Sequence, residues 1–273
     1  MKHIVTVVCD RDKDAMLLQA ESIQRYLDPC THIVVINEEN STVDWQALLS
    51  PYYTSHKLKF WSSNYWELFT ARKNGWILQQ LYKLEVAEII NEDYLILDSK
   101  NFFIKHTNLS EWKDVIGSGR LLTYDREEYI NMNKQYSEYF NLSELKKPLL
   151  NATPFKVDIK QLKKLKDGWR DYFVWCYPTD GISEFIFYSY LVHDLITNNF
   201  NEKIMYKTYW QHDSIHELTE NELNKQLADP SIKVLGFHRF FLRDISNQSF
   251  KTLNNWLEQK GWKNRINRYS DAE

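Results

Sequence analysis

The first 37 residues alternate between two short β-branched runs and one amphipathic stretch, and this order limits the possible folds more than any other feature. The runs are His3–Asp10 and Thr31–Asn37, and the apolar residues of Asp12–Leu27 between them recur at helical spacing. A buried strand, a helix and a second buried strand form a βαβ unit, in which the two strands are parallel and the crossover is right-handed. The sequence therefore predicts an α/β fold built on a mostly parallel sheet.

Later segments extend this pattern. Lys57–Trp61 and Asp93–Asp98 predict strands, and Asn74–Asn91 predicts a long helix that lacks proline. We also expect strands or extended segments at 102–105, 120–124, 153–157, 203–210 and 233–237, and helices at 44–49, 127–140, 159–169, 182–198 and 250–260. Gly261 is typical of a helix C-terminus.

Only seven glycines are present and no low-complexity linker interrupts the chain, which favours a single compact domain over 1–273. Its regular half, 1–110, is predicted to bind nucleotide. The mixed half, 111–260, is predicted to complete one continuous sheet and to form the acceptor side, and 261–273 is expected to be a solvated tail.

Charge and composition exclude several classes of protein. The chain has 34 Lys and Arg against 37 Asp and Glu, whereas general nucleic-acid binders carry an excess of positive charge. Its first apolar run is too short for a signal peptide, and no stretch approaches the ~18 apolar residues of a membrane span. Three separated cysteines fit a reducing compartment. We expect a cytoplasmic protein with no nucleic-acid partner and no transmembrane segment; the oligomeric state stays open.

Four common catalytic motifs are absent from the sequence. It contains no P-loop, Gly-x-Gly-x-x-Gly, Gly-x-Ser-x-Gly or His-Glu-x-x-His pattern. Their absence argues against a Walker-type ATPase, a dinucleotide oxidoreductase, a serine hydrolase and a zinc protease.

The segment Leu97-Asp98-Ser99-Lys100-Asn101 follows a predicted buried strand. Ligands of open α/β sheets bind beyond the carboxyl ends of parallel strands, so Asp98 is placed to meet a ribose hydroxyl or a metal ion. The alternative is that Asp98 only caps a turn, where Asp is favoured for local hydrogen bonding.

The predicted helix at 74–91 carries Trp76, Gln79, Gln80 and Lys83 on one stripe. This stripe is interpreted either as an exposed face that covers Trp76, or as a donor-binding face with Lys83 near phosphate and the glutamines on sugar hydroxyls.

Two further groups are candidates for chemistry. Asp180 and Glu184 stand at the start of an apolar helix, where Glu184 either stabilises the first turn or acts in the acceptor cleft as a general base. His238 and Arg239 follow a predicted strand, and the forked donor of Arg239 suits a diphosphate. His212 and His216 have the spacing of metal ligands but no evident third ligand.

Taken together, these segments resemble a family of bacterial and phage proteins related to GT-A glycosyltransferases. The resemblance spans roughly 3–240. It rests on the order of the opening strand, Gln19 and Ser22, the run 33–38, the run Gly75-Trp76-x-x-Gln79-Gln80-x-x-Lys83-Leu84, the run 93–101, Thr153-Pro154-Phe155, Ser183-Glu184-Phe185 with Tyr188, and Gly236-Phe237-His238-Arg239. It implies a Rossmann-type sheet and transfer of a sugar from a nucleotide-diphosphate sugar to a glycan or other acceptor.

Members of this family hold the donor's ribose and a divalent cation with an Asp-x-Asp turn. Asp98 matches the first acidic position, but Lys100 replaces the second. A protonated lysine cannot coordinate Mn²⁺ or Mg²⁺, but it can place positive charge on the diphosphate. Two alternatives follow: a metal-independent transferase, or a Mn²⁺ or Mg²⁺ enzyme whose ligands include Asp98 and His238.

The resemblance assigns donor-binding roles to Asp10, Arg72, Gln80, Lys83, Asp98, Lys100, Asn101, His238 and Arg239. Glu184 is the first candidate base and Asp180 the second if the enzyme inverts configuration; if it retains configuration, Glu184 orients substrate. One alternative is a non-catalytic nucleotide- or carbohydrate-binding protein, favoured by Lys100 and by the 10 tryptophans and 17 tyrosines. Another is a nucleotidyltransferase, but Asp10–Asp14 lacks the expected glycines.

Overall fold

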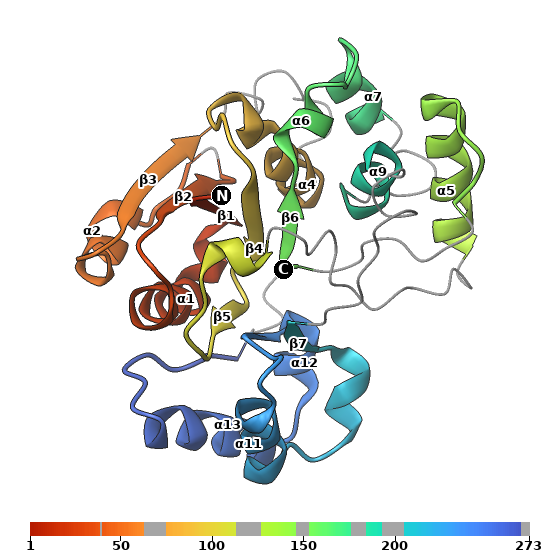
Figure 1. The fold of residues 1–273 in the computed structure, drawn as a ribbon. Helices are drawn as coiled ribbons and strands as arrows, with labels where there is room; N and C mark the ends of the chain where they lie inside the picture. Colours follow the sequence, from red (N-terminus) through yellow and green to blue (C-terminus); the bar gives the residue numbers. More distant parts are fainter. Residues whose placement is uncertain are drawn as a thin grey trace.

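A central sheet of five strands organises the chain. The computed structural model describes residues 1–38, 40–62, 75–112, 127–145, 153–175, 184–192 and 205–268. The strand order is β3-β2-β1-β4-β6, and Figure 1 shows the sheet between layers of helices. The strands are β1 (His3–Val8), β2 (Thr31–Ile36), β3 (Lys57–Ser62), β4 (Tyr94–Asp98) and β6 (Phe155–Val157). The first four are parallel and β6 is antiparallel to β4, which confirms the predicted mostly parallel sheet.

The alternation of side chains along β1 explains why helices cover both faces. Ile4 and Val8 enter a core with α1 (Lys13–Tyr26) and α2 (Trp45–Leu49). Val5 and Val7 enter a second core on the opposite face. That core includes residues of α4 (Gly75–Glu85), α5 (Glu127–Phe140), α6 (Ile159–Leu162), α7 (Trp169–Trp175) and α9 (Glu184–Leu191). Burial on both faces is why the strand consists almost entirely of apolar and β-branched residues.

A second sheet of three strands contradicts the expectation of one continuous sheet. Its order is β5 (Asn101–Phe103), β8 (Val234–Phe237) and β7 (Tyr206–Tyr209). The chain turns at Ser99 and Lys100, so that β5 leaves β4 and pairs with β8 instead. This sheet shares a third core with α11 (Glu220–Ala228), α12 (Arg239–Asp244) and α13 (Asn247–Gln259).

The prediction of one helix over 159–169 is wrong, because the structure has α6 and the beginning of α7 there. Gly168 adopts a φ of 81° directly before α7, a left-handed conformation that interrupts helical hydrogen bonding. The helix predicted at 74–91 is shorter in the structure, where α4 ends at Glu85 and a 3₁₀ turn, Val86–Glu88, follows it. Further 3₁₀ turns are Asp10–Asp12, Ser50–Tyr52, Leu109–Trp112 and Gln211–Ile215.

Several other predicted elements are confirmed, including those that became α2, α5, α13 and β6. Helix α11 and helix α12 were not predicted. The strand expected at 120–124 lies outside the described residues, as do parts of the helix expected at 182–198. None of the helices in the described ranges is long and apolar enough to cross a membrane.

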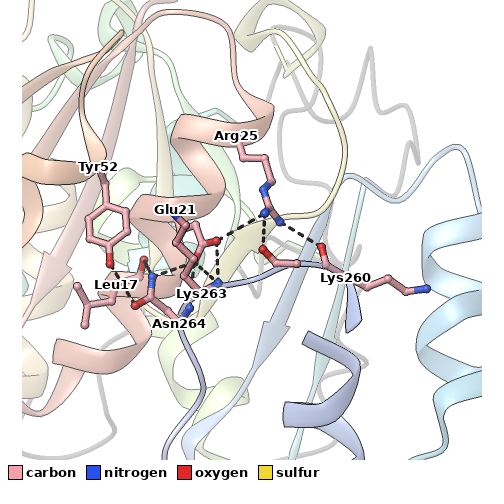
Figure 2. Close-up of polar contacts among 8 residues, drawn as sticks. Leu17, Glu21, Arg25, Tyr52, Lys260, Lys263 and Asn264 are labelled. Atoms are coloured by element: carbon pink, nitrogen blue, oxygen red, sulfur yellow. Dashed lines mark hydrogen bonds and ion pairs between the residues drawn. The ribbon is translucent and has the colours of Figure 1, made fainter. Parts of the chain in front are cut away.

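The segment after α13 is not a free tail, because Gly261, Lys263, Asn264 and Asn267 form hydrogen bonds with side chains of helix α1. Figure 2 shows Glu21 accepting hydrogen bonds from the backbone nitrogens of Lys263 and Asn264, at 3.0 and 3.1 Å. Arg25 donates to the carbonyl oxygen of Gly261 at 2.6 Å. Gly261 has a φ of 76°, which fits its predicted place at the end of α13.

Candidate functional site

Two carboxylates meet one buried lysine at the carboxyl end of β4. The Nζ atom of Lys83, on α4, lies 2.8 Å from Oδ1 of Asp98 and 2.7 Å from Oε1 of Glu184. Asp98 ends β4 and Glu184 begins α9, so three separate elements supply the cluster. Lys83 is 3% exposed and Glu184 1% exposed. The structure therefore brings together three residues that the sequence analysis assigned to two different parts of the site.

The electrostatics of this cluster keep Lys83 and Asp98 charged. Burial opposes the charge of Lys83, but Asp98 and Glu184 outweigh it and raise the pKa of its ammonium group. Burial likewise opposes ionisation of Asp98, yet the ammonium groups of Lys100 and Lys83 hold its pKa well below the usual range. Burial raises the pKa of Glu184, and the attraction of Lys83 offsets this only in part.

Lys100 completes the cluster on the side of the second sheet. Its ammonium group forms an ion pair with Oδ2 of Asp98, and it lies 5.6 Å from the ring centroid of Trp210. The rings of Trp210 and His238 lie 4.8 Å apart. A positive charge thus adjoins two neighbouring rings, an arrangement in which cation–π attraction contributes.

His238 is a neutral residue at the beginning of α12. Its Nδ1 atom accepts a hydrogen bond from the backbone nitrogen of Phe240 at 3.3 Å. Burial, reinforced by the charge of Lys100, lowers the pKa of His238 to about 3. Arg239 beside it is exposed, and its guanidinium group lies 4.8 Å from the ring centroid of Phe240.

Asn101 holds the turn that carries Asp98 and Lys100. Its Oδ1 atom accepts a hydrogen bond from the backbone nitrogen of Asp98 at 2.9 Å, and its side chain is fully buried. Gly236 lies opposite on β8, where a Cβ atom would stand 2.6 Å from Nδ2 of Asn101. Glycine is needed at 236 because any side chain would displace the amide that supports Asp98.

Asp10 binds a neighbouring loop in this structure. Its carboxylate accepts hydrogen bonds from the Ser41 hydroxyl at 2.5 Å and from the backbone nitrogen of Thr42 at 2.7 Å. Burial would raise the pKa of Asp10, but these hydrogen bonds lower it to about 2. Gln80 is buried on α4, one turn before Lys83. Arg72 and Asp180 lie outside the described residues.

The groups around Asp98 form an ion-pair network. Each of its carboxylate oxygens already has an ammonium partner, Lys83 or Lys100. In the described ranges, no three His, Cys, Asp or Glu side chains lie together so that they could hold a metal ion. The described side chains therefore form no ready-made group of three ligands for a divalent cation.

Trp210, which adjoins both Lys100 and His238, was not predicted to be a site residue. Its position was nevertheless signalled, because it is the last residue of the predicted strand 203–210, and sheet ligands gather at such ends. The contacts of Gln19 with this turn were also missed, since they depend on distant parts of the chain.

Solved glycosyltransferases share this architecture. The apo form of mouse xyloside xylosyltransferase 1 has a TM-score of 0.50 at 12% identity, over 86% of this chain and 96% of that one. The apo structure of the bifunctional glycosyltransferase WbbM has a TM-score of 0.53 at 11% identity, over 89% of this chain and 49% of that one. No protein-family model matches the sequence, and no curated protein matches it.

At such low identity the likeness defines the fold and not the reaction. The chain has the GT-A architecture, a single mixed α/β domain with a mostly parallel central sheet flanked by helices.

Proposed function

We propose that this protein is a glycosyltransferase that transfers a sugar from a nucleotide-diphosphate sugar to a glycan or other acceptor. The GT-A architecture and the charged cluster at the carboxyl end of β4 support the proposal. The observation that carries it is the ion pair between Lys100 and Asp98, which stands where an Asp-x-Asp turn is expected.

Lys100 is the residue proposed to stabilise the leaving nucleoside diphosphate. The side chain of Lys100 is 17% exposed, whereas Lys83 is buried and already contacts two carboxylates. A diphosphate that approaches Lys100 gains a charge-assisted hydrogen bond without any bound cation. Trp210 and His238, whose ring centroids lie 4.8 Å apart beside Lys100, are proposed to contact the donor. We therefore propose transfer that does not depend on Mn²⁺ or Mg²⁺.

Glu184 is proposed to fix Lys83 in place. A general base needs direct access to the acceptor hydroxyl, but Glu184 is 1% exposed and lies against Lys83. The buried ion pair instead connects α9 to the end of β4. This role agrees with a retaining transferase, in which no dedicated base is required.

A second candidate function is binding of a nucleotide or carbohydrate without turnover. The observation that favours it is the pairing of both Asp98 oxygens and of Glu184 with lysine side chains. Such pairing stabilises a fixed binding surface as well as it stabilises a catalytic one.

Release of nucleoside diphosphate from a panel of nucleotide sugars, measured with and without EDTA, separates the two functions. The proposal predicts release from one donor in EDTA, with at least a tenfold loss in Lys100→Ala. Lys105→Ala, which removes a lysine whose ammonium group binds the carbonyl oxygens of Gln226 and Asp229 instead of Asp98, is the control and keeps the wild-type rate. Ligand binding without release would favour the binding protein, and neither binding nor release would contradict both functions.

A further inference from the structure

Helix α1 holds the turn of the candidate site through two buried side chains. The amide nitrogen of Gln19 donates to the carbonyl oxygens of Asp98 and Asn101, each at 2.8 Å. One helical turn later, the hydroxyl of Ser22 accepts a hydrogen bond from the backbone nitrogen of Phe103 at 3.0 Å. Gln19 and Ser22 are both 0% exposed. Three backbone groups between 98 and 103 therefore have their partners on one face of α1.

Gln19 also ends a chain of buried polar groups that begins far from the site. Its Oε1 atom lies 2.8 Å from the hydroxyl of Thr6 on β1. That hydroxyl lies 3.0 Å from Nε2 of His32 on the neighbouring strand β2. On the other side of the ring, Nδ1 of His32 lies 2.5 Å from the hydroxyl of Tyr53. Thr6 and His32 are fully buried, so water does not reach these atoms.

The donors and acceptors of this chain fit together in only one direction. A rotated Gln19 amide would point its oxygen at two carbonyl oxygens, so its nitrogen must face them and its oxygen must accept from Thr6. The Thr6 oxygen then accepts from His32, which must carry its proton on Nε2. Nδ1 of His32 consequently accepts from Tyr53.

This order of donors and acceptors requires a neutral His32, and the surroundings of the ring favour its neutral form. Burial, with a smaller contribution from His56, lowers the pKa of His32 to about 3. A protonated ring would have two donors and would reverse the hydrogen bond with Tyr53. The ring therefore stays in one tautomer throughout the physiological pH range.

We propose that Gln19 is a positioning residue for the turn that carries Asp98 and Lys100, and that the chain Tyr53–His32–Thr6–Gln19 locks its amide in the required orientation. The hydrogen bonds stand on their own, while the effect on sugar transfer rests on the proposed function. Without the Gln19 amide, two carbonyl groups on either side of Lys100 lose their partner, and the ion pair with Asp98 loses its fixed geometry.

Thr6→Val tests the chain, because it keeps the shape of the side chain and removes only the hydroxyl. In the wild type, ¹⁵N NMR of His32 is expected to show one neutral tautomer with the proton on Nε2 from pH 5 to pH 8. Thr6→Val is expected to mix the tautomers and to speed hydrogen exchange of the Asp98 and Phe103 amides at least about tenfold, the cost of one buried unsatisfied group. Thr6→Ser restores both signals, and the amide of Val35 serves as the internal reference. A wild-type proton on Nδ1, or unchanged exchange in Thr6→Val, would overturn the proposal.

Gln19→Leu tests the consequence for the site, with Gln24→Leu as the control. Gln24 lies on the same helix, but its amide bonds Thr54 and Ser55 away from the turn. We expect kcat/KM for the donor to fall at least tenfold in Gln19→Leu and to stay unchanged in Gln24→Leu. Equal rates in the wild type and Gln19→Leu would refute the positioning role. If the wild type turns over no donor, the proposed function fails. The NMR result alone then decides whether the hydrogen-bond chain from Tyr53 to Gln19 exists. If Gln19→Leu does not fold, the comparison of Thr6→Val with Thr6→Ser decides both the hydrogen-bond chain and the positioning role of Gln19.

Discussion

The Nζ atom of Lys83 lies between two carboxylates, 2.8 Å from Oδ1 of Asp98 and 2.7 Å from Oε1 of Glu184, and all three groups come from different elements. Such a cluster contributes little net stability compared with apolar residues of the same size, but removal of one partner leaves an uncompensated buried charge.

Lys83→Met is therefore expected to destabilise the protein by about 3–5 kcal/mol, measured by urea unfolding at pH 7. Lys59→Met removes an exposed lysine from β3 and is expected to stay within about 0.5 kcal/mol of the wild type. A loss below about 1 kcal/mol in Lys83→Met would show that the ion pairs do not form as described.

Gly236→Ala is expected to disturb the support of Asp98. Its Cβ atom would stand 2.6 Å from Nδ2 of Asn101 and 3.0 Å from Oγ1 of Thr208, so we expect a loss of about 1–3 kcal/mol in unfolding free energy. Adding Asn101→Ala removes the clashing amide, and the double variant should be less destabilised than the sum of the single variants. Gly75→Ala is the matched control, because among the described residues its Cβ would meet Nδ2 of Asn37 at 3.8 Å, an ordinary van der Waals distance, and it should cause no loss. Strict additivity of the two substitutions would contradict the contact.

His32 should make stability depend on pH. Burial lowers its folded-state pKa to about 3, whereas the unfolded chain binds the proton near pH 6.5. Between these two pH values the unfolded state binds more protons than the folded state, so the free energy of unfolding rises with pH. It falls by about 1.4 kcal/mol for each pH unit below 6.5. His32→Gln removes this contribution and leaves the other groups in place. From pH 7 to pH 5 the wild type should lose about 2 kcal/mol more than the variant. Parallel profiles would mean that His32 is not held neutral.

Glu21 should control the exposure of residues 261–268 (Figure 2). Its carboxylate accepts from the backbone nitrogens of Lys263 and Asn264, and Glu21→Ala leaves both without this partner. We expect trypsin to cleave after Lys263 or Arg265 about tenfold faster in Glu21→Ala, because local opening becomes easier. Glu220→Ala removes an exposed glutamate from α11 and should cleave at the wild-type rate. Equal cleavage of both variants would show that Glu21 does not hold this segment.

The buried strands were predictable because each is a continuous apolar run that ends at a polar residue. β1, β2 and β4 all have this form, and the carboxyl end of β4 is where Lys83, Asp98 and Glu184 meet. The separation of the two sheets was not predictable, since β5 leaves β4 only because β8, far along the chain, offers it a partner.

The interactions within the site were harder to predict than its position. A lysine on a polar helical stripe is usually solvated, and nothing near Lys83 in sequence signals that Asp98 and Glu184 bury it. The roles of Gln19 and Gly236 likewise depend on Asn101, which each of them meets only in the folded chain.

Thermal stabilisation by nucleotide sugars, compared in EDTA and in Mn²⁺, shows directly whether Lys100 takes the place of a cation. A ligand that binds only the folded state raises the unfolding midpoint by mass action. If Lys100 replaces the cation, one nucleotide sugar should stabilise the wild type equally in both conditions. Lys100→Asp, which restores the second acidic residue, should lose the shift in EDTA and recover it in Mn²⁺. A wild-type shift that appears only with Mn²⁺ would mean that Lys100 does not replace the cation.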